Sequence, residues 1–148
     1  MNNMQDTKPT EAAPPKAPEY FPMDRPWEDS DGHTRLIGMC CSTCGTKAFP
    51  ARNVCSHCCA QSGLEPVRLS ARGTLYTYSE VHVAPKDFPT PYVIGFVDLE
   101  DGVRVFGQIE GPASALTPDQ TVETTTGIVR VRTNGTPVIS YKFRVFQS

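Results

Sequence analysis

The sequence predicts a mainly β protein in which a small metal-stabilised module precedes a five-stranded barrel, with a short helix near the N-terminus. Two observations lead to this expectation. All six cysteines lie between Cys40 and Cys59, and from about Arg68 onward the chain consists of short runs of β-branched and aromatic residues separated by turn sequences. Clustered cysteines are typical of a metal site, and such runs are typical of strands.

The barrel is predicted from five strand-like runs at residues 73–83, 92–99, 103–109, 128–132 and 137–146. Asp101-Gly102 and Asn134-Gly135 each separate two runs, and both dipeptides favour tight hairpin turns. Between the hairpins, residues 113–116 are expected to form one helical turn that Pro118 ends. Glycines inside the strands indicate bulges, and five strands interrupted after the third are typical of an oligonucleotide/oligosaccharide-binding (OB) barrel.

Four segments are expected along the chain. Residues 1–19 are rich in proline and poor in apolar side chains, which predicts a disordered tail. Residues 20–36 carry aromatic side chains, and Pro26 followed by Trp27 favours the first turn of a short helix. The metal module is expected at residues 37–67 as a zinc ribbon, and the barrel at residues 68–148.

The cysteine spacing predicts one structural zinc ion. Two C-x-x-C pairs, Cys41 with Cys44 and Cys55 with Cys58, are separated by ten residues. Each pair on a tight turn presents two thiolates, and two pairs complete a tetrahedron around Zn²⁺. Because four thiolates leave no open coordination position, the site is expected to stabilise structure and not to hydrolyse a substrate.

Other ligand sets stay open. Cys40 and Cys59 flank the pairs and could substitute for one of them, and His57 could replace a thiolate. Tetrahedral sulfur also suits an iron centre of rubredoxin type. Disulfides are disfavoured because no secretory signal is visible and a cytoplasmic location is expected.

Charge and hydropathy exclude some classes of function. The formal net charge is −2, whereas nucleic-acid binders usually carry a basic excess, so a nucleic-acid partner is not expected. No run of about 18 apolar residues is present, so no membrane-spanning helix is expected. The cations are concentrated at the end of the chain, where residues 127–148 hold no acid and four basic residues: Arg130, Arg132, Lys142 and Arg144.

These motifs resemble a known family. The order Cys41-x-x-Cys44-Gly45, Phe49-Pro50-x-Arg52 and Cys55-x-x-Cys58 resembles the rubredoxin-like zinc ribbon of DUF35 (ChsH2-type) proteins. Residues 69–78 and 91–105 look like the first three barrel strands of that family, so the resemblance covers about residues 36–110. The segment at residues 116–122 departs from the family pattern, which often has an Ile-Gly-Met-like segment before the fourth strand.

The resemblance implies a subunit without catalytic residues of its own. Members of the family associate with thiolases or thiolase-like acyltransferases in aromatic-compound degradation, steroid side-chain degradation and polyketide acylation. The partner would supply the nucleophilic cysteine and the histidines, and a coenzyme A thioester would lie at the interface.

Two sets of residues are candidates for these contacts. Aromatic side chains dominate protein interfaces, and the candidates for the partner interface are Phe21, Trp27, Phe49, Tyr76 and Tyr78. Residues two apart on a strand share a face, so Tyr76 and Tyr78 are expected to point the same way, with the barrel core as the alternative. The four C-terminal cations are candidates for contacts with the phosphates of coenzyme A or with an acidic patch on the partner.

Two alternative functions follow from the same motifs. Zinc ribbons and OB barrels also bind single-stranded nucleic acid, which would need stacking aromatics in a basic groove. The chain could instead be a stand-alone acyl-CoA-binding protein or thioesterase. The sequence shows no G-x-S-x-G motif, phosphate loop or dinucleotide fingerprint, and His33 and His82 lie in a turn and late in a strand.

Overall fold

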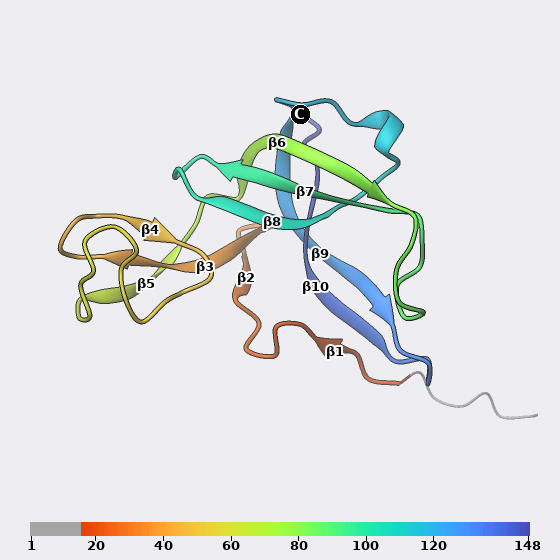
Figure 1. The fold of residues 1–148 in the computed structure, drawn as a ribbon, viewed down its shortest axis with the longest axis horizontal. Coiled ribbons are helices and arrows are strands. Elements are labelled where there is room, and N and C mark those ends of the chain that lie inside the picture. Colours follow the sequence, from red (N-terminus) through yellow and green to blue (C-terminus); the bar gives the residue numbers. More distant parts are fainter. Residues whose placement is uncertain (1–15) are drawn as a thin grey trace, which may run out of the picture.

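The computed structural model describes residues 16–148, which form two small sheets that share no strand (Figure 1). The first sheet contains β2 (Trp27–Ser30), β3 (His33–Cys41), β4 (Lys47–Ala48) and β5 (Leu64–Arg68). The second contains β1 (Glu19–Tyr20), β6 (Arg72–Val81), β7 (Tyr92–Leu99), β8 (Arg104–Ile109), β9 (Thr121–Val131) and β10 (Pro137–Val145). A 3-10 turn, η1 (Ala113–Ala115), precedes β9.

Strands β6 to β10 form the closed five-stranded barrel that the sequence predicts, but β9 begins at Thr121 and not at the predicted residue 128. The strand order β10-β8-β7-β6-β9 is closed by a further pairing of β10 with β9. All these neighbours are antiparallel except β8 and β10, which run parallel. The turns at Asp101-Gly102 and Asn134-Gly135 connect hairpins as predicted, and both glycines have positive φ angles of 85° and 88°.

The barrel interior is filled by aliphatic side chains around one aromatic ring. Phe143 on β10 is completely buried, and Leu75, Val97, Val105 and Val122 surround the same core. Gly107 on β8 faces this ring, and a Cβ at that position would lie 2.9 Å from Phe143 Cε2. A glycine is therefore required where β8 passes the ring.

Strand β3 organises the smaller sheet. It pairs with β2, β4 and β5, all antiparallel. The cysteine-bearing loops extend from its C-terminal end, on the side of the molecule away from the β9–β10 hairpin (Figure 1). Because β3 spans residues 33–41, it continues across the boundary predicted between the aromatic segment and the ribbon.

The short N-terminal helix expected after Pro26 is wrong. Trp27 to Ser30 are extended and pair with His33 to Leu36 across a two-residue turn at Asp31-Gly32. Both turn residues have positive φ, 53° and 76°, which is the type I′ geometry that an Asp-Gly dipeptide favours in a hairpin. This turn signal outweighs the preference of proline for the first position of a helix.

The expectation that Tyr76 and Tyr78 share a face is also wrong. Leu75 pairs with Val97 and Thr77 with Phe96, so Tyr76 is an extra residue in β6. This β-bulge interrupts the alternation of side chains. Tyr78 packs against the barrel core and its hydroxyl donates a hydrogen bond to the carbonyl of Leu116 at 2.8 Å, whereas Tyr76 is 52% exposed on the outer face.

Most of the predicted disordered tail, residues 1–15, lies outside the described residues. The described chain that follows is attached to the barrel, because Glu19 and Tyr20 pair in parallel with Val138 and Ile139 of β10. Within residues 16–148, no helix is long and apolar enough to cross a membrane.

We expect Phe143→Ala to lower the free energy of unfolding of the barrel by about 3–5 kcal/mol, because it removes a fully buried ring and leaves a cavity. Urea denaturation followed by far-UV circular dichroism measures the loss. Ile128→Ala on β9 is the control: its side chain is 52% exposed, and the change should stay within about 0.5 kcal/mol. Equal effects for the two variants would contradict the assignment of the core.

Candidate metal centre

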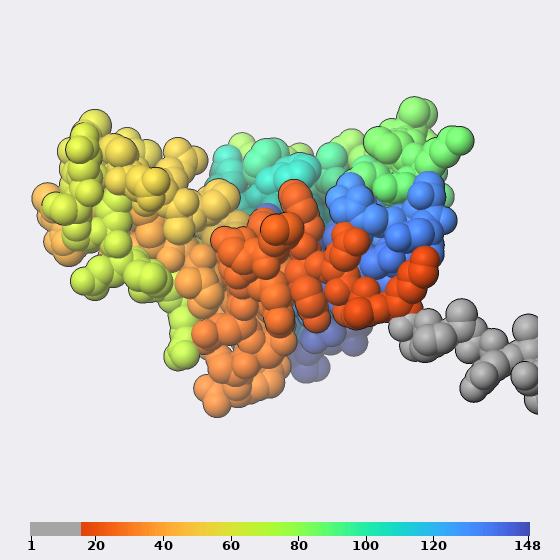
Figure 2. Space-filling view, turned by 90° about the horizontal axis from the view of Figure 1, so that it is seen from below, coloured from red at the N-terminus to blue at the C-terminus, as the bar shows by residue number. Residues whose placement is uncertain are grey.

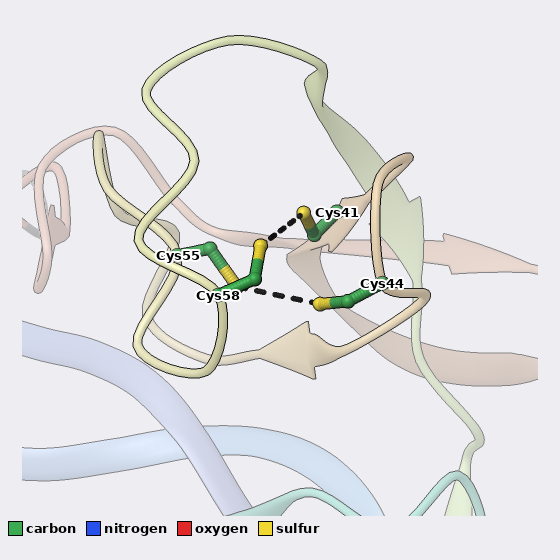
Figure 3. Close-up of side chains that lie close together, drawn as sticks. All are labelled: Cys41, Cys44, Cys55 and Cys58. Carbon is green, nitrogen blue, oxygen red and sulfur yellow. Dashed lines mark hydrogen bonds between the residues drawn. The ribbon is translucent and has the colours of Figure 1, made fainter.

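Four cysteine sulfurs converge at the end of β3. Cys41 ends the strand, Cys44 lies in the turn before β4, and Cys55 and Cys58 lie in the long loop between β4 and β5 (Figure 3). All four Sγ atoms lie within 4.8 Å of one another, with Cys41 3.6 Å from Cys58 and Cys44 3.7 Å from Cys55. Zinc–sulfur bonds of about 2.3 Å place the corners of a tetrahedron roughly 3.8 Å apart, so these four cysteines can hold a metal ion.

The two C-x-x-C turns have the same backbone geometry. In the first, the N–H of Gly45 donates to the carbonyl of Cys41 at 2.7 Å and the N–H of Cys41 donates to the carbonyl of Thr46 at 2.9 Å. In the second, the equivalent bonds run from Cys59 to Cys55 at 3.0 Å and from Cys55 to Ala60 at 2.9 Å. Each turn presents two sulfurs on one side, and the two sides face each other (Figure 3).

This equivalence explains Cys59. It occupies the position that Gly45 holds in the first turn, and both residues have positive φ, 63° and 76°. Its side chain is exposed and is not part of the four-sulfur cluster. The signal was present in the sequence as two copies of Cys-Ser-x-Cys, each followed by the residue that reverses the chain.

The two other alternative ligands also lie outside the cluster. The Cys40 sulfur points to the carbonyl oxygen of Gly45, 3.8 Å away. His57 contributes its backbone N–H, which donates to the sulfur of Cys55 at 3.4 Å. The structure therefore groups the two predicted C-x-x-C pairs and leaves out Cys40, Cys59 and the imidazole of His57.

Hydrogen bonding affects the thiols unequally. A bond from the backbone N–H of Cys44 lowers the pKa of Cys41. The side chain and backbone of Thr46 lower the pKa of Cys44 to about 6, with the Thr46 Oγ1 3.1 Å from the sulfur. At Cys58 a backbone bond from Ala60 has the same effect, but desolvation and the neighbouring sulfurs together raise the pKa to about 12. Four thiolates this close repel one another, so a cation between them is needed for all four to ionise.

The donor set fits Zn²⁺. Four sulfurs in a tetrahedral arrangement suit zinc or iron, and they occupy every position of a four-coordinate ion. Few apolar side chains are buried around the loops, so a metal ion is the element best placed to hold them together.

The predicted aromatic interface residues do not lie on one surface. Trp27 is 6% exposed and packs between Tyr20 and Tyr141 at centroid distances of 6.3 and 6.4 Å. Phe49 of the ribbon packs edge-on against Tyr141 at 5.5 Å. Together with the inward position of Tyr78, these contacts leave two of the five as exposed aromatics, Phe21 and Tyr76.

Three of the four C-terminal cations contact groups within the chain. The Nε atoms of Arg132 and Arg144 lie 2.6 and 2.8 Å from carboxylate oxygens of Glu19 and Glu123, and Lys142 Nζ donates to the carbonyl of Ile128 at 3.4 Å. Arg130 makes no ion pair with any acid in residues 16–148. Its guanidinium carbon instead lies 5.6 Å from the centroid of the Phe88 ring.

Similarity to known proteins agrees with this architecture. Residues 66–127 match the profile of the ChsH2 C-terminal OB-fold domain. The chain is 47% identical over 87 residues to a DUF35 domain-containing scaffold protein of Methanocaldococcus jannaschii, covering 57% of this chain and 62% of that protein. It is 37% identical over 144 residues to the benzoylsuccinyl-CoA thiolase subunit BbsA of Thauera aromatica, covering 95% of this chain and 99% of that subunit. The chain belongs to the DUF35 family.

A solved DUF35 structure shows the same fold. The Ltp2-ChsH2(DUF35) aldolase superposes with a TM-score of 0.62 at 24% identity, covering 75% of this chain and 84% of the other. The DUF35 family assignment and the barrel-plus-ribbon fold implied by the sequence motifs are confirmed.

We expect Cys44→Ser and Cys58→Ser to weaken zinc binding at least about 100-fold, since loss of an outer-shell contact alone costs roughly 10–100-fold at zinc sites. Metal content per purified chain, measured by inductively coupled plasma mass spectrometry, should fall well below one equivalent. Cys40→Ser and Cys59→Ser are matched controls that should keep one equivalent, because their sulfurs lie outside the cluster. Loss of metal in a control would show that the ligand set is different.

Removal of the metal by a chelator should loosen residues 42–63 and leave the barrel folded, because the barrel has its own apolar core and the loops do not. Limited proteolysis with and without EDTA measures this. Cleavage should appear between Cys44 and Cys58 and should be reversed by added zinc. Unfolding of the barrel on chelation would contradict this division.

Proposed function

We propose that this chain is a non-catalytic, zinc-binding subunit that associates in the cytoplasm with a thiolase-like enzyme and supports acyl-CoA chemistry on that partner. The observation that carries the proposal is the similarity to a benzoylsuccinyl-CoA thiolase subunit over nearly the whole length of both chains. A second relative of that name, from Geobacter metallireducens, is 37% identical over 109 residues, which cover 74% of this chain and 73% of that subunit.

The placement of the reactive side chains supports a non-catalytic role. Four of the six cysteines face one another in the cluster, where coordination to a metal ion would lower the nucleophilicity of their thiolates. His82 lies at the surface, 67% exposed, with its Nε2 2.8 Å from a carboxylate oxygen of Glu80. Nucleophilic catalysis needs a nucleophile and a base in hydrogen-bond contact, and the thiolase-like partner is proposed to supply both.

The ribbon is proposed to act as a docking arm whose orientation is fixed on the barrel. Its Lys47 lies 3.4 Å from the carboxylate of Asp101 in the β7–β8 turn, and the same carboxylate accepts a hydrogen bond from the backbone N–H of Ser70 at 2.7 Å. Phe49 on Tyr141 forms a second contact between ribbon and barrel. A rigid arm presents its loops at low entropic cost, which favours a stable complex.

We propose that the coenzyme A thioester lies at the interface with the partner. Among the four C-terminal cations, Arg130 is the best candidate to bind an anionic group of the thioester. To bind Arg132, Arg144 or Lys142, a phosphate or an acidic group would first have to displace an internal contact. These contacts are with Glu19, Glu123 and the carbonyl of Ile128, respectively. The same internal pairing weakens the basic groove that a single-stranded nucleic-acid binder would need.

Co-purification tests the proposal. Tagged chain expressed in its native host should retain a thiolase-like polypeptide, identified by mass spectrometry, and the eluate should show thiolase or acyl-transfer activity. Cys44→Ser and Cys58→Ser should lose zinc and the partner together, and Cys59→Ser should keep both. A chain that elutes alone, or that turns over an acyl-CoA without a second polypeptide, would contradict the subunit role.

A further inference from the structure

A groove of about 340 Å³ lies on the outer side of the barrel. Its floor is formed by β7 and β8, and its walls by three segments that are far apart in sequence: the β6–β7 loop, the β9–β10 hairpin and the chain after β1. The space-filling view shows these segments meeting around the β7 and β8 strands (Figure 2). The side chains that matter to the argument are Phe21, Phe88, Ile94, Phe106, Gln108 and Arg130.

The floor of the groove is apolar on a face where a barrel strand normally meets water. Side chains alternate across a strand, and the outward positions of β7 are Tyr92, Ile94 and Phe96. Phe96 pairs with Phe106 of β8, and the ring centroids lie 5.4 Å apart. Phe106 lines the groove and is 49% exposed, and Phe96 lies beside it and is 41% exposed, so the chain itself covers this face only in part.

Backbone and side-chain hydrogen bonds hold each wall in place. The N–H of Phe21 donates to the carbonyl of Ile139 at 2.9 Å, and the N–H of Val131 donates to the carbonyl of Asp87 in the β6–β7 loop at 2.9 Å. Gln108 Nε2 on the floor donates to the carbonyl of Val129 at 3.3 Å. Because hydrogen bonds hold its walls, the groove is already formed without a ligand, which reduces the entropic cost of binding.

One charged side chain lines this groove. Arg130 lies at its edge beside the ring of Phe88, which itself stacks on Tyr92 with centroids 5.9 Å apart. The neighbouring cation, Arg132, is paired with Glu19. An apolar cleft with one cation that has no acidic partner among residues 16–148 has the charge and polarity to hold an apolar group that ends in one negative charge.

We propose that the groove binds an aromatic carboxylate, with its ring over Ile94 and Phe106 and its carboxylate on the guanidinium of Arg130. The volume lies at the lower end of the roughly 300–1,000 Å³ of small-molecule sites, which fits one substituted ring with a short chain. The groove is narrow and enclosed by three hydrogen-bonded segments. This shape favours a small ligand over a protein surface, since the core of a protein interface is broad and closely packed on both sides.

Combined with the proposed function, this ligand class indicates the natural ligand. It would be a coenzyme A thioester whose acyl group contains an aromatic ring and a second carboxylate that is free to bind Arg130. That identification rests on the proposed function. Binding of the free acid to the groove does not, because it needs only this chain.

The test uses the purified zinc-loaded full chain and 4-phenylbutyrate as the probe, followed by two-dimensional ¹H–¹⁵N NMR. Saturable shifts should be confined to amides around the groove, among them Phe21, Ile94, Gln108 and Val129, with a Kd in the millimolar range or below. The neutral amide of the same acid should bind roughly tenfold more weakly, because it cannot form the charge-assisted contact.

Matched variants assign the contacts. Arg130→Gln should weaken binding of the acid roughly tenfold and leave binding of the neutral amide unchanged. Arg132→Gln, two residues further along the chain, should have little effect because Arg132 is paired with Glu19. Phe106→Ala should weaken acid and amide alike. Tyr76→Ala is its control, an equally exposed aromatic side chain outside the groove.

Several outcomes would overturn the proposal. These are no saturable shifts up to about 10 mM acid, shifts centred elsewhere, or equal losses for the two arginine variants. If unacylated coenzyme A bound at Arg130 and the acid did not, Arg130 would be a binding residue for a phosphate of coenzyme A and not for a carboxylate. If Phe106→Ala abolished capture of a thiolase-like partner while the acid did not bind, the groove would be a protein-docking surface and the subunit role would stand.

Discussion

Strand β10 is hydrogen-bonded to three other strands, and the rest of the structure depends on this arrangement. Antiparallel pairing with β9 and parallel pairing with β8 close the barrel, while the start of β10 pairs with β1 and holds the N-terminal segment. Phe143 fills the barrel from this strand, and Tyr141 supports Phe49 of the ribbon and Trp27 of β2. Closure of the barrel also removes the exposed strand edges that would otherwise invite aggregation.

The two parts of the molecule are stabilised by different physics. The barrel buries a continuous aliphatic core, and the hydrophobic effect is sufficient to fold it. The cysteine loops bury little besides two of their own thiols, so a metal ion held by the four sulfurs would supply the stabilisation that an apolar core does not. In zinc-finger peptides such metal–thiolate bonds contribute about 10–16 kcal/mol. The contact between Lys47 and Asp101 connects the two parts and couples the orientation of the ribbon to the barrel.

Local sequence signals predicted the elements whose geometry is decided within a few residues. The turns at Asp101-Gly102 and Asn134-Gly135 fixed two hairpins, and the alternation of apolar residues located the strands they connect. The same type of dipeptide, Asp31-Gly32, forms a third hairpin, and this turn overrides the preference of Pro26 for the first position of a helix, so the predicted short helix is wrong. The cysteine spacing was informative because a C-x-x-C turn fixes two sulfurs locally.

By itself, then, the sequence determined the two C-x-x-C pairs, the number and order of the barrel strands and the family, since each depends on residues close together or on motifs that are specific in combination. It did not determine the start of β9, which lies at Thr121 and not at residue 128. The tertiary structure decided which side chains remain available. A bulge turns Tyr76 and Tyr78 to opposite faces. Arg132 is one of the four C-terminal cations, and it is paired with Glu19, 113 positions away in the sequence. The groove beside Arg130 exists because three distant segments meet, and such long-range contacts leave no local pattern in the chain.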